Sequence, residues 1–208
     1  MYEIDYPYCT NFAKNTNSYY FTSYKAQTKN IELILSSKFV QIMLKKIHIE
    51  LKWAINFGIA FLLWMIIEKS SGLHDRRIAD YTVLTNVFIL IIVGIYFVAL
   101  LDKKKNVYQG KMTQSQGFIS GILLTLFIGL LTPFLLRISL QYISPEFFSS
   151  MQSYMVSSKK MTAEQVKLYY NYRSFLLQTL FLNFSLGILS SAIFSFTLSA
   201  KTPATHEK

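Results

Sequence analysis

The residues of this chain that could do chemistry within a membrane are few, and most of them are amides. Five polar side chains fall within or close to long apolar stretches: Asn56, Asn86, Arg137, Gln178 and Asn183. A polar group at membrane depth is a candidate for a solute path or a ligand contact. The amides can also bond between helices, and Arg137 lies near enough to the end of its stretch to reach the interface. Because we expect no buried Asp, Glu or His in any stretch, the pattern argues against a proton-coupled pump.

Common catalytic and metal-binding motifs do not occur in the sequence. It contains no phosphate-binding glycine loop that ends in Lys-Ser or Lys-Thr, no HExxH and no GxSxG. His48, His74 and His206 are far apart, and we expect all three to be solvated. Cys9 is the single cysteine, so it can form neither an internal disulfide nor a multi-cysteine metal site. We therefore expect a protein that is not an enzyme and binds no cofactor and no metal.

Four long stretches that are nearly free of charge must position these polar residues. They cover about 51–68, 81–101, 115–141 and 174–200. A bilayer core about 30 Å thick needs roughly 20 apolar residues in a helix. Charged residues make up only 15% of the chain, against about 25% in a soluble domain. The sequence therefore predicts an all-α fold, an integral membrane four-helix bundle over 43–201.

The ends of the chain differ from this membrane domain. Residues 1–42 are rich in Tyr and Asn and show no sustained period, so we interpret them as a disordered extension. An alternative hypothesis is that translation starts at Met43, because two lysines and then an apolar span follow it, as at the start of an N-terminal membrane anchor. Residues 202–208 are interpreted as a tail.

Capping signals predict an extramembrane helical hairpin over 144–173, between the third and fourth spans. Ser144-Pro145 is typical of an N-cap followed by Pro at the first helical position, and apolar residues at spacings of three and four follow it. Thr162 with Gln165 fits a capping box. We expect the helix that begins there to run without a break into the fourth span.

Small residues recur at every fourth position of the third and fourth spans. This spacing lets two helix backbones approach closely where water supplies no driving force. We expect the two spans to pack against each other or against a second copy, although the glycines and Pro133 could instead mark a broken helix that lines a path. A capping box at Thr113 and Gln116 predicts that the third helix begins near Gln114. The small-residue positions expected at the packing face are Gly117, Gly121, Thr125, Gly129, Gly187, Ser191 and Ser195.

The net charge of +10 comes from basic residues that lie between the apolar spans. Lys and Arg near the spans are more numerous on the side with both termini and the second loop, so the positive-inside rule predicts cytoplasmic termini and an outside hairpin. Lys103, Lys104 and Lys105 form the densest basic cluster, which we expect to contact anionic lipid. This distribution predicts the lipid bilayer as a partner and no nucleic acid.

Several short motifs follow one another along residues 47–200. The first loop holds Gly72-Leu73-His74, and a basic second loop leads to Gly110-Lys111-Met112-Thr113 and then Gln116-Gly117-Phe118. Ser144-Pro145-Glu146-Phe147 precedes the hairpin, and a last span rich in Gly and Ser follows. In this order the motifs resemble a family of bacterial four-span membrane proteins defined by a domain of unknown function. The resemblance implies a bacterial inner-membrane location, and because the family has no established activity it assigns no role to any residue.

Three functions remain open on this reasoning. The first is a non-enzymatic, self-associating scaffold or regulatory partner of a membrane protein, which the small-residue positions and the hairpin favour. The second is a channel or transporter for a small solute, with Asn56, Asn183 and Arg137 near the path. Four spans are few, so that function would require an oligomer. The third is an enzyme that acts on lipid or envelope precursors.

Overall fold

The computed structural model describes residues 47–199. The chain divides into two units, and residues 48–199 belong to the unit His48–Lys208. The predicted extension over 1–42, the alternative start at Met43 and the tail over 202–208 lie outside the described residues.

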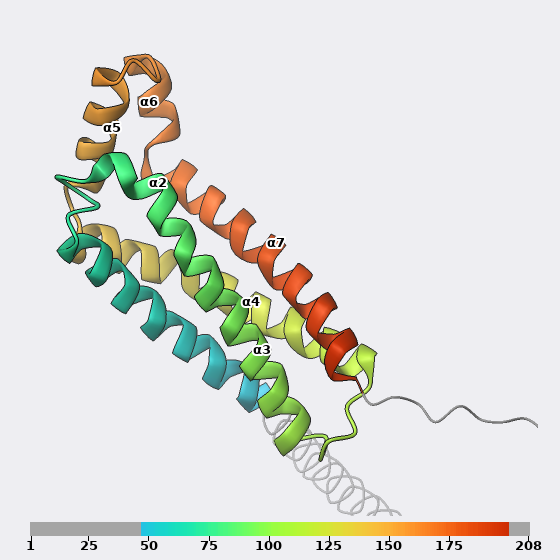
Figure 1. Ribbon diagram of the computed structural model, residues 1–208. Helices are drawn as coiled ribbons and strands as arrows, with labels where there is room; N and C mark the ends of the chain where they lie inside the picture. Colours follow the sequence, from blue (N-terminus) through green and yellow to red (C-terminus); the bar gives the residue numbers. More distant parts are fainter. Residues whose placement is uncertain (1–46, 200–208) are drawn as a thin grey trace, which may run out of the picture. The chain divides into compact units, whose positions relative to one another are not determined.

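Four helices in the described part are long and apolar enough to cross a membrane (Figure 1). At about 1.5 Å per residue, even the shortest of them exceeds a hydrocarbon core of roughly 30 Å. The predicted all-α bundle is therefore confirmed, and the chain is a multi-pass membrane protein by the length and composition of these helices. Their bounds are Ile47–Ser70, Ile78–Asn106, Gln114–Ile143 and Tyr172–Leu198.

The second and third spans are each assembled from consecutive helical segments. The second comprises η1 (Ile78–Asp80), α2 (Tyr81–Leu84), η2 (Thr85–Val87) and α3 (Phe88–Asn106). The third begins at α4 (Gln114–Ile138) and continues as the π-helical η3 (Ser139–Ile143). The predicted start of α4 is confirmed, because the Thr113 side chain accepts from the Gln116 backbone and the Gln116 side chain from the Thr113 backbone.

The hairpin consists of α5 (Phe147–Ser157) and α6 (Ala163–Tyr169), which lie beyond one end of the long helices in Figure 1. The capping box of Thr162 and Gln165 forms as predicted. The prediction of a helix unbroken into the fourth span is wrong, since α6 ends and α7 (Tyr172–Leu198) begins anew. The cause is Asn171, whose Oδ1 accepts from Ser174 N at 3.0 Å and whose Nδ2 donates to Leu168 O at 2.8 Å.

The small residues of α4 and α7 face each other within one chain. A Cβ added at Gly121 would lie 2.5 Å from Ser191 Cβ, and one added at Gly117 would lie 3.1 Å from Ser195 Cβ. Without side chains at these positions the two backbones approach closely. Gly187 lies against Thr125, and Gly129 lies against the ring of Phe184.

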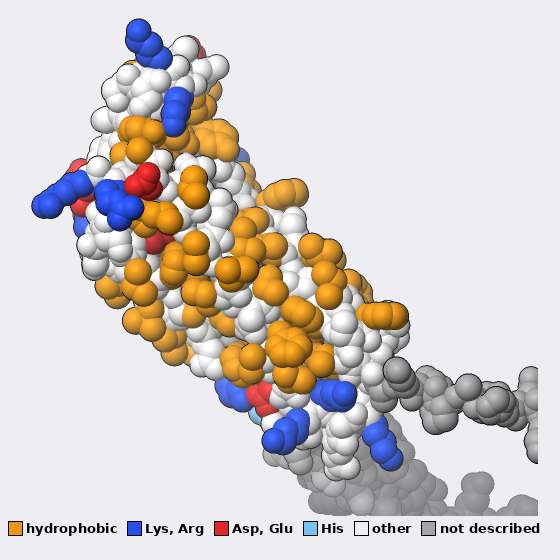
Figure 2. Space-filling model, viewed as in Figure 1, with side chains coloured by type: hydrophobic (Ala, Val, Ile, Leu, Met, Phe, Trp, Pro, Cys, Tyr) orange, Lys and Arg blue, Asp and Glu red, His pale blue; other side chains and the backbone are white. Residues whose placement is uncertain are grey.

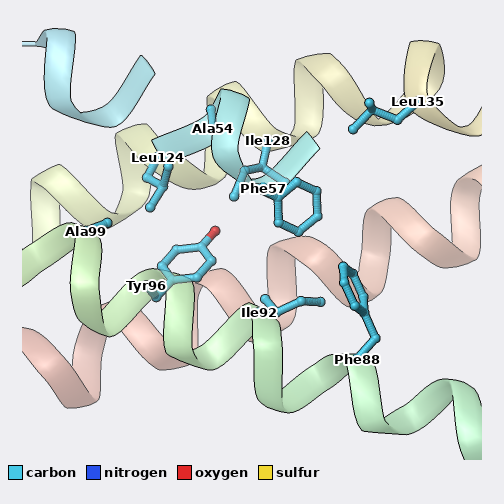
Figure 3. Close-up of a cluster of buried hydrophobic side chains, with 9 residues drawn as sticks. All are labelled: Ala54, Phe57, Phe88, Ile92, Tyr96, Ala99, Leu124, Ile128 and Leu135. Atoms are coloured by element: carbon cyan, nitrogen blue, oxygen red, sulfur yellow. The ribbon is translucent and has the colours of Figure 1, made fainter. Parts of the chain in front are cut away.

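The apolar core lies between the first described helix, α3 and α4. Figure 3 shows Phe57, Ile92, Tyr96 and Leu124 directed into the space between these helices. The Tyr96 hydroxyl donates to Thr125 Oγ1 at 2.8 Å, which satisfies a polar group inside the bundle.

Large apolar side chains also cover the outside of the bundle. Figure 2 shows them over the middle of the visible face, with Lys and Arg towards its two ends. Leu90 is 73% exposed and Phe181 is 76% exposed. An apolar surface of this extent is typical of a face that meets lipid rather than water.

Candidate functional site

A partly open pocket of about 220 Å³ lies between the first described helix, the second span and α7. Its polar lining includes Glu68 and the amide side chains Asn86, Gln178 and Asn183. Its aromatic lining is Phe61, Trp64, Tyr81, Phe88 and Phe175. A mostly apolar cavity with a few converging polar groups is the usual form of a small-ligand site.

Glu68 is the acidic residue of this pocket, and its position follows from the first described helix. Trp64 lies one turn earlier on the same face and donates from Nε1 to Glu68 Oε1 at 2.7 Å. His74 Nε2 lies 3.3 Å from Glu68 Oε2. Glu68 is only 1% exposed, so these two contacts offset the cost of burying a carboxylate.

His74 is buried against the hairpin, and the expectation that it is solvated is wrong. The loop turns back at Gly72, whose φ of +77° a residue with a side chain rarely adopts. His74 Nδ1 then lies 2.5 Å from Ser144 Oγ, and its ring meets Phe147 edge-on at 5.1 Å. The His74 imidazole, in the loop after the first described helix, therefore contacts both that helix and the segment before α5.

Ser144, His74 and Glu68 form a hydrogen-bonded series of the kind used by serine hydrolases. Ser144 has 0% exposure and lies outside the pocket lining, so a substrate in the pocket does not meet its hydroxyl. The arrangement instead links the first described helix, the loop after it and the segment before α5. Ser144 was predicted to be an N-cap, but its hydroxyl contacts His74 and α5 begins later, at Phe147.

The structure brings three of the five predicted polar residues to this pocket. Asn183 is buried and donates from Nδ2 to Thr132 Oγ1 at 3.1 Å. Asn86 donates from Nδ2 to Thr82 O at 2.7 Å, and Gln178 is half-buried. Asn56 and Arg137 are exposed and lie outside the pocket lining.

Residues 52–199 match the family described as "Protein of unknown function (DUF4199)". The chain belongs to the DUF4199 family. The resemblance inferred from the motif order is thus confirmed as membership of a domain-of-unknown-function family with four candidate membrane helices. Neither a curated protein nor a solved structure matches the chain.

A second buried ionic group lies at the opposite end of the first helix of this DUF4199 chain. Lys103 Nζ lies 2.7 Å from Glu50 Oε1, and Ser120 Oγ donates to the same oxygen at 2.5 Å. The prediction that Lys103 contacts anionic lipid is wrong. Its side chain is buried inside the bundle, where it meets Glu50. Lys104 is half-buried and Lys105 is exposed. Burial and then the Glu50 carboxylate raise the pKa of Tyr108 nearby.

The two glutamates of the first described helix are buried, contrary to the expectation of no buried acid in a span, and they are the candidate site residues that sequence reasoning missed in this DUF4199 member. Glu50 and Glu68 flank the apolar stretch, where an acid is commonly solvated. Burial of Glu68 could have been inferred from Trp64, which lies four residues earlier on the same helix face and carries an indole N–H donor. Glu50 offered no comparable local signal, because its partners come from α3 and α4.

Proposed function

We propose that this protein is a non-enzymatic receptor of the bacterial inner membrane. It binds a small ligand in the Glu68 pocket and regulates another membrane protein through its hairpin. The observation that carries the proposal is a buried carboxylate in a partly open pocket between membrane helices. A buried charge in such a place costs free energy and is by default a functional candidate.

The wall of the pocket is continuous with the hairpin. Phe175 lines the pocket, and its ring centroid lies 5.5 Å from that of Phe147 and 5.8 Å from that of Phe148. Phe147 packs with Met151, Met155 and other residues into a second apolar cluster. A ligand that displaces the Phe175 ring therefore repacks the base of the hairpin, because close-packed side chains transmit strain.

The hairpin has a surface suited to a partner outside the bilayer. Lys160 Nζ donates to the Tyr154 hydroxyl at 2.9 Å and lies 4.8 Å from the ring centroid. This hydrogen bond lowers the pKa of Tyr154. Tyr154 is half-buried, and tyrosine is among the residues enriched in protein interfaces. We propose that both termini are cytoplasmic and that the hairpin lies on the outer side.

Two further observations support a receptor over the other functions. The Ser144 hydroxyl is sealed from the pocket, which supports a role without catalysis. The small residues that could mediate self-association are already occupied between α4 and α7. We therefore propose a different membrane protein, rather than a second copy, as the partner.

The test is native mass spectrometry of the protein released from lipid nanodiscs. We expect a small-molecule adduct on the unsubstituted protein and its loss in Thr179→Phe, which fills the pocket. The matched control is Ile188→Phe on α7, where the side chain is 48% exposed on the outside of the bundle. Absence of any adduct from the unsubstituted protein, or retention of the adduct in Thr179→Phe, would contradict a ligand in this pocket.

A small-solute transporter is the second candidate because buried hydroxyls lie between the pocket and the Glu50 end of the bundle. They belong to Thr132, Thr125 and Ser191. Each hydroxyl donates to a carbonyl of its own helix four residues earlier. The three hydroxyl donors therefore have partners without a solute, which favours the receptor. Uptake of the pocket ligand into proteoliposomes would establish transport, whereas binding without uptake supports the receptor.

A further inference from the structure

We infer that the Glu68 pocket binds a compact organic ammonium group. This inference rests on the proposed ligand-binding function and names the chemical class of the ligand. Four features of the pocket carry it: its charge, its unused acceptors, its aromatic walls and its size.

The charge of the lining favours a cation. Glu68 is the acid among the described lining residues, and no Lys or Arg is among them. A neutral His74 satisfies both of its contacts if Nε2 donates to Glu68 and Nδ1 accepts from the Ser144 hydroxyl. In that form the carboxylate charge at the pocket has no cationic counterpart among the lining residues.

Glu68 and the two asparagines of the pocket retain hydrogen-bond acceptors. A carboxylate can accept about four hydrogen bonds, and Glu68 accepts from Trp64 and His74 alone among the described residues. Asn183 must donate to Thr132, because the Thr132 hydroxyl donates to Ile128 O. Asn86 donates to a backbone carbonyl. Both asparagines therefore keep their side-chain oxygens, whose partial negative charge favours a cation.

The walls suit the apolar surface of an alkylated ammonium group. Five aromatic side chains line the pocket beside the carboxylate: Phe61, Trp64, Tyr81, Phe88 and Phe175. The Trp64 and Phe88 rings stack with centroids 5.6 Å apart, so their positions are set before any ligand arrives. Aromatic faces attract cations by about 0.5–2 kcal/mol each, and most strongly where water is excluded.

The volume and the opening of the pocket limit which molecules can bring an ammonium group into it. A volume of about 220 Å³ lies below the range of about 300–1,000 Å³ that is usual for ligand pockets, so it suits a small ligand or headgroup. Asn86 and Leu182 line the pocket and are exposed on the outside of the bundle. The opening at these residues accepts either a free amine or the headgroup of an aminophospholipid.

The test measures binding to the full-length protein in nanodiscs by the fluorescence of the two tryptophans. The probes are tetramethylammonium, choline and 3,3-dimethylbutanol, the last being an uncharged analogue of choline. A separate arm compares nanodiscs made with and without phosphatidylethanolamine. We expect choline to bind more tightly than the uncharged analogue by about tenfold or more, since a desolvated carboxylate discriminates charge. A response confined to the phosphatidylethanolamine arm also supports an ammonium ligand and assigns it to the lipid.

Two variants measure separately how much the Glu68 charge and the aromatic walls contribute to binding. Glu68→Gln keeps the size of the side chain and should weaken choline binding by about tenfold or more. Phe88→Leu should weaken it by about threefold to tenfold, because one aromatic wall is lost. The matched controls are Glu164→Gln in α6 and Phe134→Leu, an exposed phenylalanine of α4, and both should bind as the unsubstituted protein does. Size-exclusion chromatography confirms that each variant is folded.

The outcomes distinguish this inference from the proposed function. Equal binding of choline and 3,3-dimethylbutanol, or unchanged binding in both folded Glu68→Gln and Phe88→Leu, would overturn the ammonium assignment. A pocket-dependent adduct of another chemical class would overturn it as well, while leaving the receptor proposal in place. If neither an adduct nor any ammonium binding is found, both proposals fail.

Discussion

Lys103 Nζ lies 2.7 Å from Glu50 Oε1, and both side chains are buried inside the bundle. The pair joins the first described helix to the end of α3, while Ser120 adds a hydrogen bond from α4. Two charges taken out of water are stable only as a matched pair with further hydrogen bonds. This end of the bundle is therefore sensitive to any change of one partner.

Lys103→Met should destabilise the protein by about 3–5 kcal/mol, because it leaves the Glu50 carboxylate buried without its cation. The double variant Glu50→Gln with Lys103→Met should recover most of that loss, since no uncompensated charge remains. Unfolding in mixed detergent micelles measures the free energies. The matched control is Lys105→Met, on the exposed surface of the same cluster. A double variant less stable than Lys103→Met alone would contradict the pairing.

Gly121→Ala should destabilise the α4–α7 packing by about 1–3 kcal/mol, because the added methyl group overlaps the Ser191 side chain and forces the two backbones apart. Gly94→Ala is the matched control, since nothing lies within 4 Å of a Cβ built there. It should leave stability unchanged or raise it by up to about 1 kcal/mol, as Ala favours a helix. Thermal unfolding in detergent measures both. Equal effects of the two substitutions would rule out a close approach at Gly121.

Ser144→Ala should cost about 1–3 kcal/mol of stability, because His74 Nδ1 loses its buried partner. It should leave the pocket ligand bound, since Ser144 lies outside the pocket lining. Ser153→Ala on the exposed face of α5 is the control and should change neither property. Thermal unfolding and native mass spectrometry give the two measurements. Loss of a lipid-modifying activity in Ser144→Ala without loss of stability would favour an enzyme instead.

A cysteine placed in the hairpin should be accessible from outside the cell, because the positive-inside rule places the basic second loop in the cytoplasm. In a Cys9→Ser background, a membrane-impermeant maleimide should label Ser158→Cys on intact cells. Lys111→Cys, in the second loop, should react only after the membrane is permeabilised. The reverse pattern of labelling would invert the proposed orientation.

The spans and the helix starts of this fold could be predicted, because they depend on residues that are close together in the sequence. The four apolar stretches are long enough to span a bilayer whatever lies beside them. The capping boxes at Thr113 and Thr162 are satisfied within a single turn. Among the polar residues, Asn183 is directed into the bundle together with the small residues of its own helix.

Other features required the tertiary structure because they depend on partners that are distant in the sequence. Ser144 lies 70 positions from His74, and Lys103 lies 53 positions from Glu50. A histidine in a polar loop and a lysine in a basic run both have the local character of solvated groups. Whether such a group is buried depends on whether a hydrogen-bonding partner from another helix offsets the cost of its desolvation. Apolar length by itself thus determined the spans, whereas the packing of helices decided which charges lie inside.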